Sequence, residues 1–154
     1  MTSIDTNTAA TDPSLWWKQA VVYQVYPRSF KDTTGSGLGD IAGVTAKIPY
    51  LKELGVDAIW LSPFYPSQLA DGGYDVDDYR NVDPKLGTMA DFDELAQTAH
   101  AAGIRIVVDI VPNHSSNQHE WFKAAVASGP GSPERDRYIF RDGKGPNGDQ
   151  PPTD

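Results

Sequence analysis

The order of apolar patterns along the chain constrains the fold most. Three short runs rich in β-branched and aromatic residues, at residues 20–27, 56–62 and 104–111, have the composition of strands. Between them, apolar residues recur at helical spacing in residues 40–54 and 91–102. The third run is almost continuously apolar, which predicts a strand buried on both faces. This β-α-β-α-β order predicts an α/β fold with a parallel sheet, either doubly wound or part of a (β/α)8 barrel.

Residues that start and stop helices set the expected bounds of the two helices. Asp40 is a plausible N-cap and Gly55 a stop for the first helix. Pro49 lies inside the same helical pattern and predicts a kink or break there. For the second helix, Asp91 followed three residues later by Glu94 indicates an N-terminal capping pair.

The remaining segments have less regular patterns. Residues 1–14 are polar and are expected to form a disordered tail. The long loop at residues 63–87 has a length that is usually functional. Residues 119–128 predict a short helix, and residues 137–140 are a brief strand candidate in an otherwise irregular, Gly/Pro-rich C-terminal part.

Charge and composition exclude several classes of partner. The formal net charge of −8 and the lack of any basic run argue against nucleic acid and against an anionic membrane surface. The chain has no cysteine for a disulfide or a thiolate metal site, and no apolar run long enough for a membrane span or a signal peptide. We therefore expect a cytoplasmic protein with a small neutral ligand as its partner.

The glycine-rich loop after the first strand, KDTTGSGLGDIAG at residues 31–43, has three rival interpretations. Residues 37–42 fit the G-x-G-x-x-A of a dinucleotide site, but the loop lies about ten residues beyond Pro27 and no acidic residue ends the second strand. Every second position offers an oxygen ligand for a weak calcium or magnesium site: Asp32, Thr34, Ser36, the carbonyl of Leu38 and Asp40. A hydrogen-bonded turn without a metal explains the same pattern.

The second strand is followed by ADGGYDVDDY, in which two glycines separate Asp71 from Tyr74. These glycines allow a tight bend that directs the carboxylate and the ring toward the same volume, which suits a sugar. The alternative is a solvated acidic loop with Tyr74 as a packing residue. Asp75, like the two acidic residues that follow it, is expected to be a solvated or loop-ordering charge.

The third strand ends in DIVPNHSS, which presents His114 at the carboxyl edge of the predicted sheet, where ligands of parallel-sheet folds bind. His114 could act as an acid or base, bind a ligand by hydrogen bonding or coordinate a metal, and a structural histidine is the alternative. His100 and His119 are expected to be ordinary surface histidines.

Taken together, VVYQVYPRSF, the glycine loop, YLKELGVDAIWLSPFYPS, DGGYDVDDY and DIVPNHSS resemble the start of the α-amylase family, glycoside hydrolase family 13. Within the family they are most similar to the α-glucosidase and oligo-1,6-glucosidase branch. The resemblance favours the (β/α)8 barrel and implies a domain B inserted after its third strand. Residues 15–115 would be the N-terminal part of the catalytic barrel, and residues 116–154 the start of an incomplete domain B.

The resemblance also implies roles for several residues. In the glucosidase branch the aspartate and tyrosine of the D-x-x-Y motif hold the terminal glucose, and they correspond to Asp71 and Tyr74. The histidine that contacts the 6-hydroxyl corresponds to His114. A calcium or magnesium ion in the loop after strand one usually has Asp, Asn, Asp, a carbonyl and Asp as ligands, whereas this chain has Thr34 and Ser36 at the second and third of these positions.

Family members are retaining glycosidases with two catalytic carboxylates. The resemblance implies that these follow strands four and five, so no catalytic residue is expected before Asp154. The full-length protein is expected to be an exo-acting α-glucosidase that releases glucose from maltose-type or isomaltose-type substrates. A trehalose synthase, sucrose isomerase, glucosyltransferase or inactive truncated relative is the alternative. By itself the chain is expected to be inactive and, with open sheet edges, poorly stable.

Overall fold

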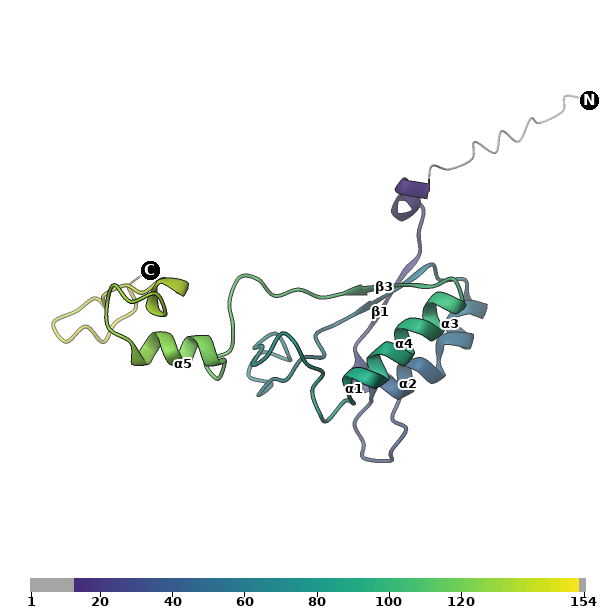
Figure 1. The fold of residues 1–154 in the computed structure, drawn as a ribbon, viewed down its shortest axis with the longest axis horizontal. Helices are drawn as coiled ribbons and strands as arrows, with labels where there is room; N and C mark the ends of the chain where they lie inside the picture. The colour runs from purple at the N-terminus through teal and green to yellow at the C-terminus, as the bar shows by residue number, and fades with distance from the viewer. Residues whose placement is uncertain (1–12, 153–154) are drawn as a thin grey trace, which may run out of the picture. The chain divides into compact units, whose positions relative to one another are not determined.

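The computed structural model describes residues 13–152, which form two compact units (Figure 1). The first unit contains the residues up to Phe64 together with residues 81–110. The second contains residues 65–80 together with the residues from Val111 onward. The expected boundary between barrel and domain B at residue 115 remains a prediction.

The first described element is the 3-10 helix η1 (Pro13–Lys18). Most of the predicted N-terminal tail, residues 1–12, lies outside the described residues. The guanidinium of Arg105 lies 4.3 Å from the centroid of the Trp16 ring, so η1 is attached to the first unit by a cation–π contact.

A three-stranded parallel sheet is the centre of the first unit. Its strands, β1 (Val22–Val25), β2 (Ala58–Leu61) and β3 (Arg105–Val108), are hydrogen-bonded in the order β1-β2-β3. The first residues of the three strands pair with one another, so the strands also end level. The predicted parallel sheet is thereby confirmed.

Four helices belong to the same unit: α1 (Pro27–Phe30), α2 (Ile41–Ala46), α3 (Ile48–Leu54) and α4 (Met89–Ala101). Figure 1 shows α2, α3 and α4 side by side next to the strands. The apolar core of the unit consists of fully buried strand and helix side chains, among them Val25, Ile59, Leu61, Ile41, Val44, Leu51, Leu95 and Ala99. Removal of these side chains from water is the main source of the unit's stability.

The prediction that the third strand is buried on both faces is wrong. Ile106 and Val108 are half-buried, whereas Arg105 and Val107 between them are exposed. Since β3 lies at one edge of the described sheet, only the face that contacts the helices is covered. The other edge, β1, is similar, because its Val22 is 48% exposed.

The expected bounds of the first helix are confirmed. The carboxylate of Asp40 accepts a hydrogen bond from the Gly43 N–H at 2.6 Å and so caps α2. The expected break occurs at Lys47, directly before the turn of α3 that contains Pro49. Gly55 ends α3 with φ of 86°, a left-handed conformation that favours glycine.

The expected capping pair of the second helix is wrong in register. Thr88 is the N-cap, and its hydroxyl accepts a hydrogen bond from the Asp91 N–H at 3.2 Å. Asp91 is the third helical residue, and its carboxylate accepts the Thr88 N–H at 2.7 Å. A capping box therefore starts α4 three residues earlier than the Asp91–Glu94 spacing indicated.

The second unit contains α5 (Glu120–Ala127), as predicted, and a short 3-10 helix η2 (Arg135–Arg137). Residues 137–140 are not a strand: Arg137 ends η2 and Ile139 is 90% exposed. Extended backbone becomes a strand only where a neighbouring chain accepts its hydrogen bonds, and these residues pair with no described segment. Within residues 13–152 no helix is both long and apolar enough to span a lipid bilayer.

Candidate functional site

Residues 65–80 of the second unit form a closed loop that carries two of the predicted site residues. An isolated antiparallel bridge joins Ser67 to Val76 at its base. At the tip, the Tyr74 N–H donates to the Asp71 carbonyl at 2.9 Å, which closes a turn around two glycines with φ of 62° and 107°. Left-handed values of this kind are readily adopted only by glycine, so the G-G pair makes the turn possible. The sequence prediction of a tight bend between Asp71 and Tyr74 is confirmed.

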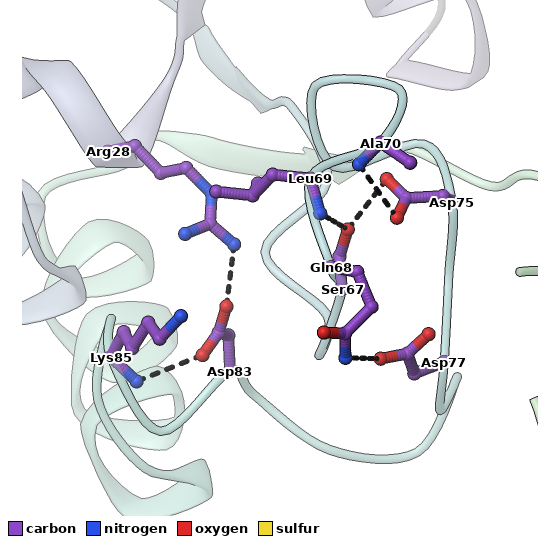
Figure 2. A network of polar contacts seen from close by, with 9 residues as sticks. All are labelled: Arg28, Ser67, Gln68, Leu69, Ala70, Asp75, Asp77, Asp83 and Lys85. Atoms are coloured by element: carbon purple, nitrogen blue, oxygen red, sulfur yellow. Dashed lines mark hydrogen bonds and ion pairs between the residues drawn. The ribbon is translucent and has the colours of Figure 1, made fainter. Parts of the chain in front are cut away.

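Asp75 organises the interior of this loop (Figure 2). Its side chain is only 8% exposed. One carboxylate oxygen accepts from the Ser67 hydroxyl at 2.7 Å and from the Asp71 N–H at 3.0 Å, and the other accepts from the Ala70 N–H at 3.0 Å. Desolvation raises the pKa of Asp75, but these hydrogen bonds outweigh it and the net pKa is lowered. Of the two roles expected for Asp75, the structure shows the loop-ordering one.

Leu69 is the one non-glycine residue with positive φ among the described residues, at 62°. Its N–H donates to the Ser67 hydroxyl at 2.9 Å, and that hydroxyl in turn donates to Asp75. A leucine in this conformation is strained and persists only where surrounding contacts enforce it. The network in Figure 2 supplies such contacts.

His114 meets the tip of the same loop. Its Nε2 lies 3.2 Å from the Tyr74 carbonyl, and its Nδ1 lies 3.2 Å from the side-chain amide nitrogen of Asn113. Because a carbonyl only accepts, Nε2 carries the proton in this arrangement and Nδ1 accepts from the amide. The structure therefore brings His114 and Tyr74 together, as expected if both strand-end segments serve one site.

The role of Tyr79 is not among the predictions made from the sequence. Its hydroxyl lies 2.9 Å from the Val111 carbonyl and 2.6 Å from the His114 carbonyl, so it attaches the His114 segment to the loop. Burial, then the nearby Tyr138 and Tyr65, raise the pKa of Tyr79, which keeps the hydroxyl protonated as a donor. The signal in the sequence was a second tyrosine five residues after Tyr74, but its partners are about thirty residues away in the chain.

The prediction that His119 lies at the surface is wrong, because its side chain is buried and only 5% exposed. Its Nδ1 accepts the Trp121 N–H at 3.1 Å, and it is thereby the N-cap of α5. Its ring packs against Trp121, with 4.9 Å between ring centroids, and against Tyr79 at 5.5 Å. His100 is exposed, as predicted.

In the first unit, a buried ion pair fixes the segment that follows the loop (Figure 2). The guanidinium of Arg28 lies 2.6 Å from the carboxylate of Asp83, and both side chains are buried. The Asp83 N–H donates to the Phe64 carbonyl at 2.8 Å, so the residues that flank loop 65–80 are joined to each other.

The expected metal loop is held together by its own hydrogen bonds. The carboxylate of Asp32 accepts the N–H groups of Thr34, Gly35 and Gly37 at 2.7–2.9 Å. These bonds, Gly37 and Thr34 first, lower the pKa of Asp32 to about 2. Asp40 accepts from the N–H and the hydroxyl of Thr33 and from its helix cap.

Ser36 and Leu38, the third and fourth of the expected metal-ligand positions, are hydrogen-bonded to each other. The hydroxyl of Ser36 contacts the Leu38 carbonyl at 3.3 Å and accepts the Leu38 N–H at 3.2 Å. Within residues 13–152, three or more acidic, histidine or cysteine side chains are nowhere grouped as metal ligands would be. The loop therefore offers a calcium or magnesium ion only two charged ligands, Asp32 and Asp40, and both already accept hydrogen bonds.

The glycines of this loop have a packing role that replaces the dinucleotide interpretation. A Cβ at Gly39 would lie 2.2 Å from the Pro27 carbonyl oxygen, and a Cβ at Gly43 would lie 2.0 Å from the Lys31 carbonyl oxygen. Neither distance is sterically possible, so both positions need glycine for close approach of backbone. The helix that follows, α2, has only six residues.

Known proteins with similar sequence and structure identify the family. The family described as "Alpha amylase, catalytic domain" matches residues 24–154. The oligo-1,6-glucosidase of Parageobacillus thermoglucosidasius is 53% identical over 137 residues, which are 89% of this chain and 24% of that protein.

Two solved structures agree with this match. The trehalose-6-phosphate hydrolase of Bacillus licheniformis aligns with a TM-score of 0.82 and 55% identity over 89% of this chain and 24% of that one. The trehalulose synthase of Pseudomonas mesoacidophila MX-45 aligns with a TM-score of 0.80 and 58% identity over 84% of this chain and 23% of that one. The chain thus spans about a quarter of the length of these relatives.

The chain belongs to the α-amylase family, glycoside hydrolase family 13, and its relatives support the α-glucosidase branch. Its parallel sheet and helices are the first βα units of the family's (β/α)8 barrel.

Proposed function

We propose that the complete protein carrying this chain is a retaining, exo-acting enzyme that releases glucose from short α-glucosides such as maltose or isomaltose. The relatives support this substrate class through their names: an oligo-1,6-glucosidase, a trehalose-6-phosphate hydrolase and a trehalulose synthase. In this proposal Asp71, Tyr74 and His114 hold the terminal glucose. The nucleophile and the general acid are supplied by residues beyond Asp154.

One observation carries the proposal: the 3.2 Å contact between Nε2 of His114 and the carbonyl of Tyr74. It brings an imidazole to the loop tip that already holds an exposed carboxylate, Asp71, and a half-buried ring, Tyr74. A carboxylate accepts hydrogen bonds from sugar hydroxyls, and an aromatic ring covers the apolar face of a pyranose. The N–H of the His114 imidazole can donate to a sugar hydroxyl that takes the place of the Tyr74 carbonyl as its acceptor. These are the groups that a small neutral sugar requires.

Substitution of Asp71 tests the proposal in the complete protein. Asp71→Asn removes a charged acceptor, and a hydrogen bond to a charged group contributes about 1.5–3 kcal/mol, so kcat/KM for an aryl α-glucoside should fall about 10- to 100-fold. Asp93→Asn makes the same chemical change at an exposed position of α4 and should leave kcat/KM unchanged. An unchanged kcat/KM in Asp71→Asn would contradict the assignment.

A second candidate, an enzyme that rearranges α-glucosides, is favoured by the 58% identity to a trehalulose synthase. Product analysis with sucrose separates the two. Glucose and fructose in equal amounts indicate hydrolysis, whereas an isomer of sucrose indicates rearrangement. A protein that converts no α-glucoside would be an inactive relative.

We further propose that the protein needs no cofactor and that hydrogen bonds close the loop of residues 32–40 without calcium or magnesium. The support for this is the set of N–H and hydroxyl donors that already occupy the carboxylates of Asp32 and Asp40. A cytoplasmic location remains a prediction.

A further inference from the structure

Asp75 is buried beside the proposed sugar-binding residues without being one of them. It lies four residues after Asp71, and its carboxylate accepts the Asp71 N–H at 3.0 Å. Its other partners, the Ser67 hydroxyl at 2.7 Å and the Ala70 N–H at 3.0 Å, belong to the same loop. All three bonds are internal, so the carboxylate holds the conformation of the loop.

These bonds fix the backbone of Asp71 on both sides. Its N–H is bound by Asp75, and its carbonyl accepts the Tyr74 N–H at 2.9 Å. With both peptide groups held, the position of the Asp71 Cα–Cβ bond is set, and with it the direction in which the carboxylate leaves the loop. Small displacements of such a group are costly, because productive sugar contacts tolerate errors of well under an ångström.

The loop has other conformations available once these bonds are lost. Two glycines with positive φ lie between Asp71 and Tyr74, and Leu69 holds a strained φ of 62°. The glycines can adopt many other backbone angles, and Leu69 would leave its strained φ if the Ser67 hydroxyl that accepts its N–H were no longer held by an acceptor. The carboxylate of Asp75 is that acceptor.

We propose that Asp75 is a positioning residue of the terminal-sugar site, which acts on substrate only through the backbone of Asp71. This inference rests on the proposed function. An asparagine at this position is the informative change, because its shape is retained while one oxygen becomes an N–H₂ donor. That donor faces either the Ala70 N–H or the pair formed by the Asp71 N–H and the Ser67 hydroxyl, so at least one hydrogen bond is lost.

A double-mutant cycle in the complete protein tests the coupling. Asp75→Asn should lower kcat/KM for an aryl α-glucoside about 10-fold or more in the wild-type background. In the Asp71→Asn background the same change should cost less than about 3-fold, because the carboxylate that Asp75 positions is already absent. Equal losses in both backgrounds would overturn the proposal, since a merely structural residue lowers activity regardless of Asp71. Asp93→Asn is the matched control.

Amide hydrogen exchange provides a measurement that does not depend on the substrate. In Asp75→Asn the amides of Ala70 and Asp71 should exchange faster than in the wild type, with the helices unaffected. If the wild type converts no α-glucoside, the proposed function fails, but faster exchange at these amides still supports the positioning and unchanged exchange overturns it. Ser67→Ala, which removes one donor and keeps the carboxylate, should show a smaller effect in the same direction if Asp75→Asn does not fold.

Discussion

At the scale of single residues, the two outer aspartates of the loop after β1 show how the same sequence pattern can serve two purposes. Asp32 and Asp40 occupy the positions of metal ligands in the family pattern, yet each accepts several hydrogen bonds from the loop itself. Thr34 and Ser36 stand where that pattern has an amide and a third carboxylate. Fewer charges lower the affinity for a hard cation, while the added hydroxyls make internal hydrogen bonds possible.

We therefore predict that stability does not depend on calcium. The thermal midpoint of the complete protein should be the same in EDTA as in millimolar calcium chloride. The double variant Thr34→Asn, Ser36→Asp restores the family pattern and should acquire a calcium-dependent rise in midpoint, because a ligand that binds only the folded state stabilises it. A clear rise for the wild type on calcium addition would show that the loop binds metal after all.

The candidate site itself was predictable only in part. The tight turn between Asp71 and Tyr74 could be predicted from its two glycines, and the position of His114 just after a predicted strand marked it as a candidate for the same site. The roles of Asp75 and Tyr79 could not be predicted, because they depend on hydrogen-bond partners that only the folded loop brings within reach. His119 was misjudged for a similar reason, since burial by aromatic neighbours leaves no local pattern.

At the scale of elements, the strands and helices of the first unit are easier to predict from the sequence than the residue at which a helix begins. Alternating strand and helix patterns predicted every strand and the main helices of the first unit, because apolar periodicity reflects which face is buried. The N-terminus of α4 was misplaced because Asp91 can serve as an N-cap or as the third residue of a capping box. The burial of β3 was overestimated because an apolar run does not reveal what covers each face.

The capping box of α4 gives a prediction about stability. Thr88→Ala should lower the free energy of unfolding by about 1 kcal/mol, whereas Thr88→Ser keeps the hydroxyl and should have little effect. Urea unfolding of the complete protein, followed by circular dichroism, provides the comparison. Equal losses in both variants would mean that the hydroxyl is not the group that matters.

Asp91, whose carboxylate accepts a hydrogen bond from the Thr88 hydroxyl, makes the stability of the protein depend on pH. Hydrogen bonds from the Thr88 hydroxyl and N–H lower the pKa of Asp91 below 3.8. Since the folded pKa lies below the unfolded one, the stabilisation is complete above about pH 4 and is lost as the pH falls through the folded pKa. The difference in stability between the wild type and Asp91→Asn should therefore be largest near neutral pH and shrink in acid.

At the scale of the whole molecule, the described sheet has two open edges and one face without helices. Val22 on β1 and Val107 on β3 are exposed, and Ile110, just after β3, is 72% exposed. In the family's closed barrel such edges are paired, and unpaired edges promote association with other chains. By contrast, the face of the sheet that the helices cover has fully buried side chains, and α1 and α2 pack closely at Gly39 and Gly43.

We predict that chain 1–154 alone releases no glucose from maltose or an aryl α-glucoside and tends to aggregate. Glucose release is measured with a coupled assay, and aggregation by light scattering. The complete protein, assayed in parallel, should be active and monodisperse under the same conditions. Turnover by the isolated chain at a rate near that of the complete protein would refute the placement of the catalytic carboxylates beyond Asp154.

The most direct test of the central claim is a crystal structure of the complete protein with glucose bound. We predict that the sugar's hydroxyls contact the Asp71 carboxylate and the His114 imidazole, and that one face of the ring lies against Tyr74. Glucose bound elsewhere, with none of these three side chains in contact, would contradict the assignment of this loop as the terminal-sugar site.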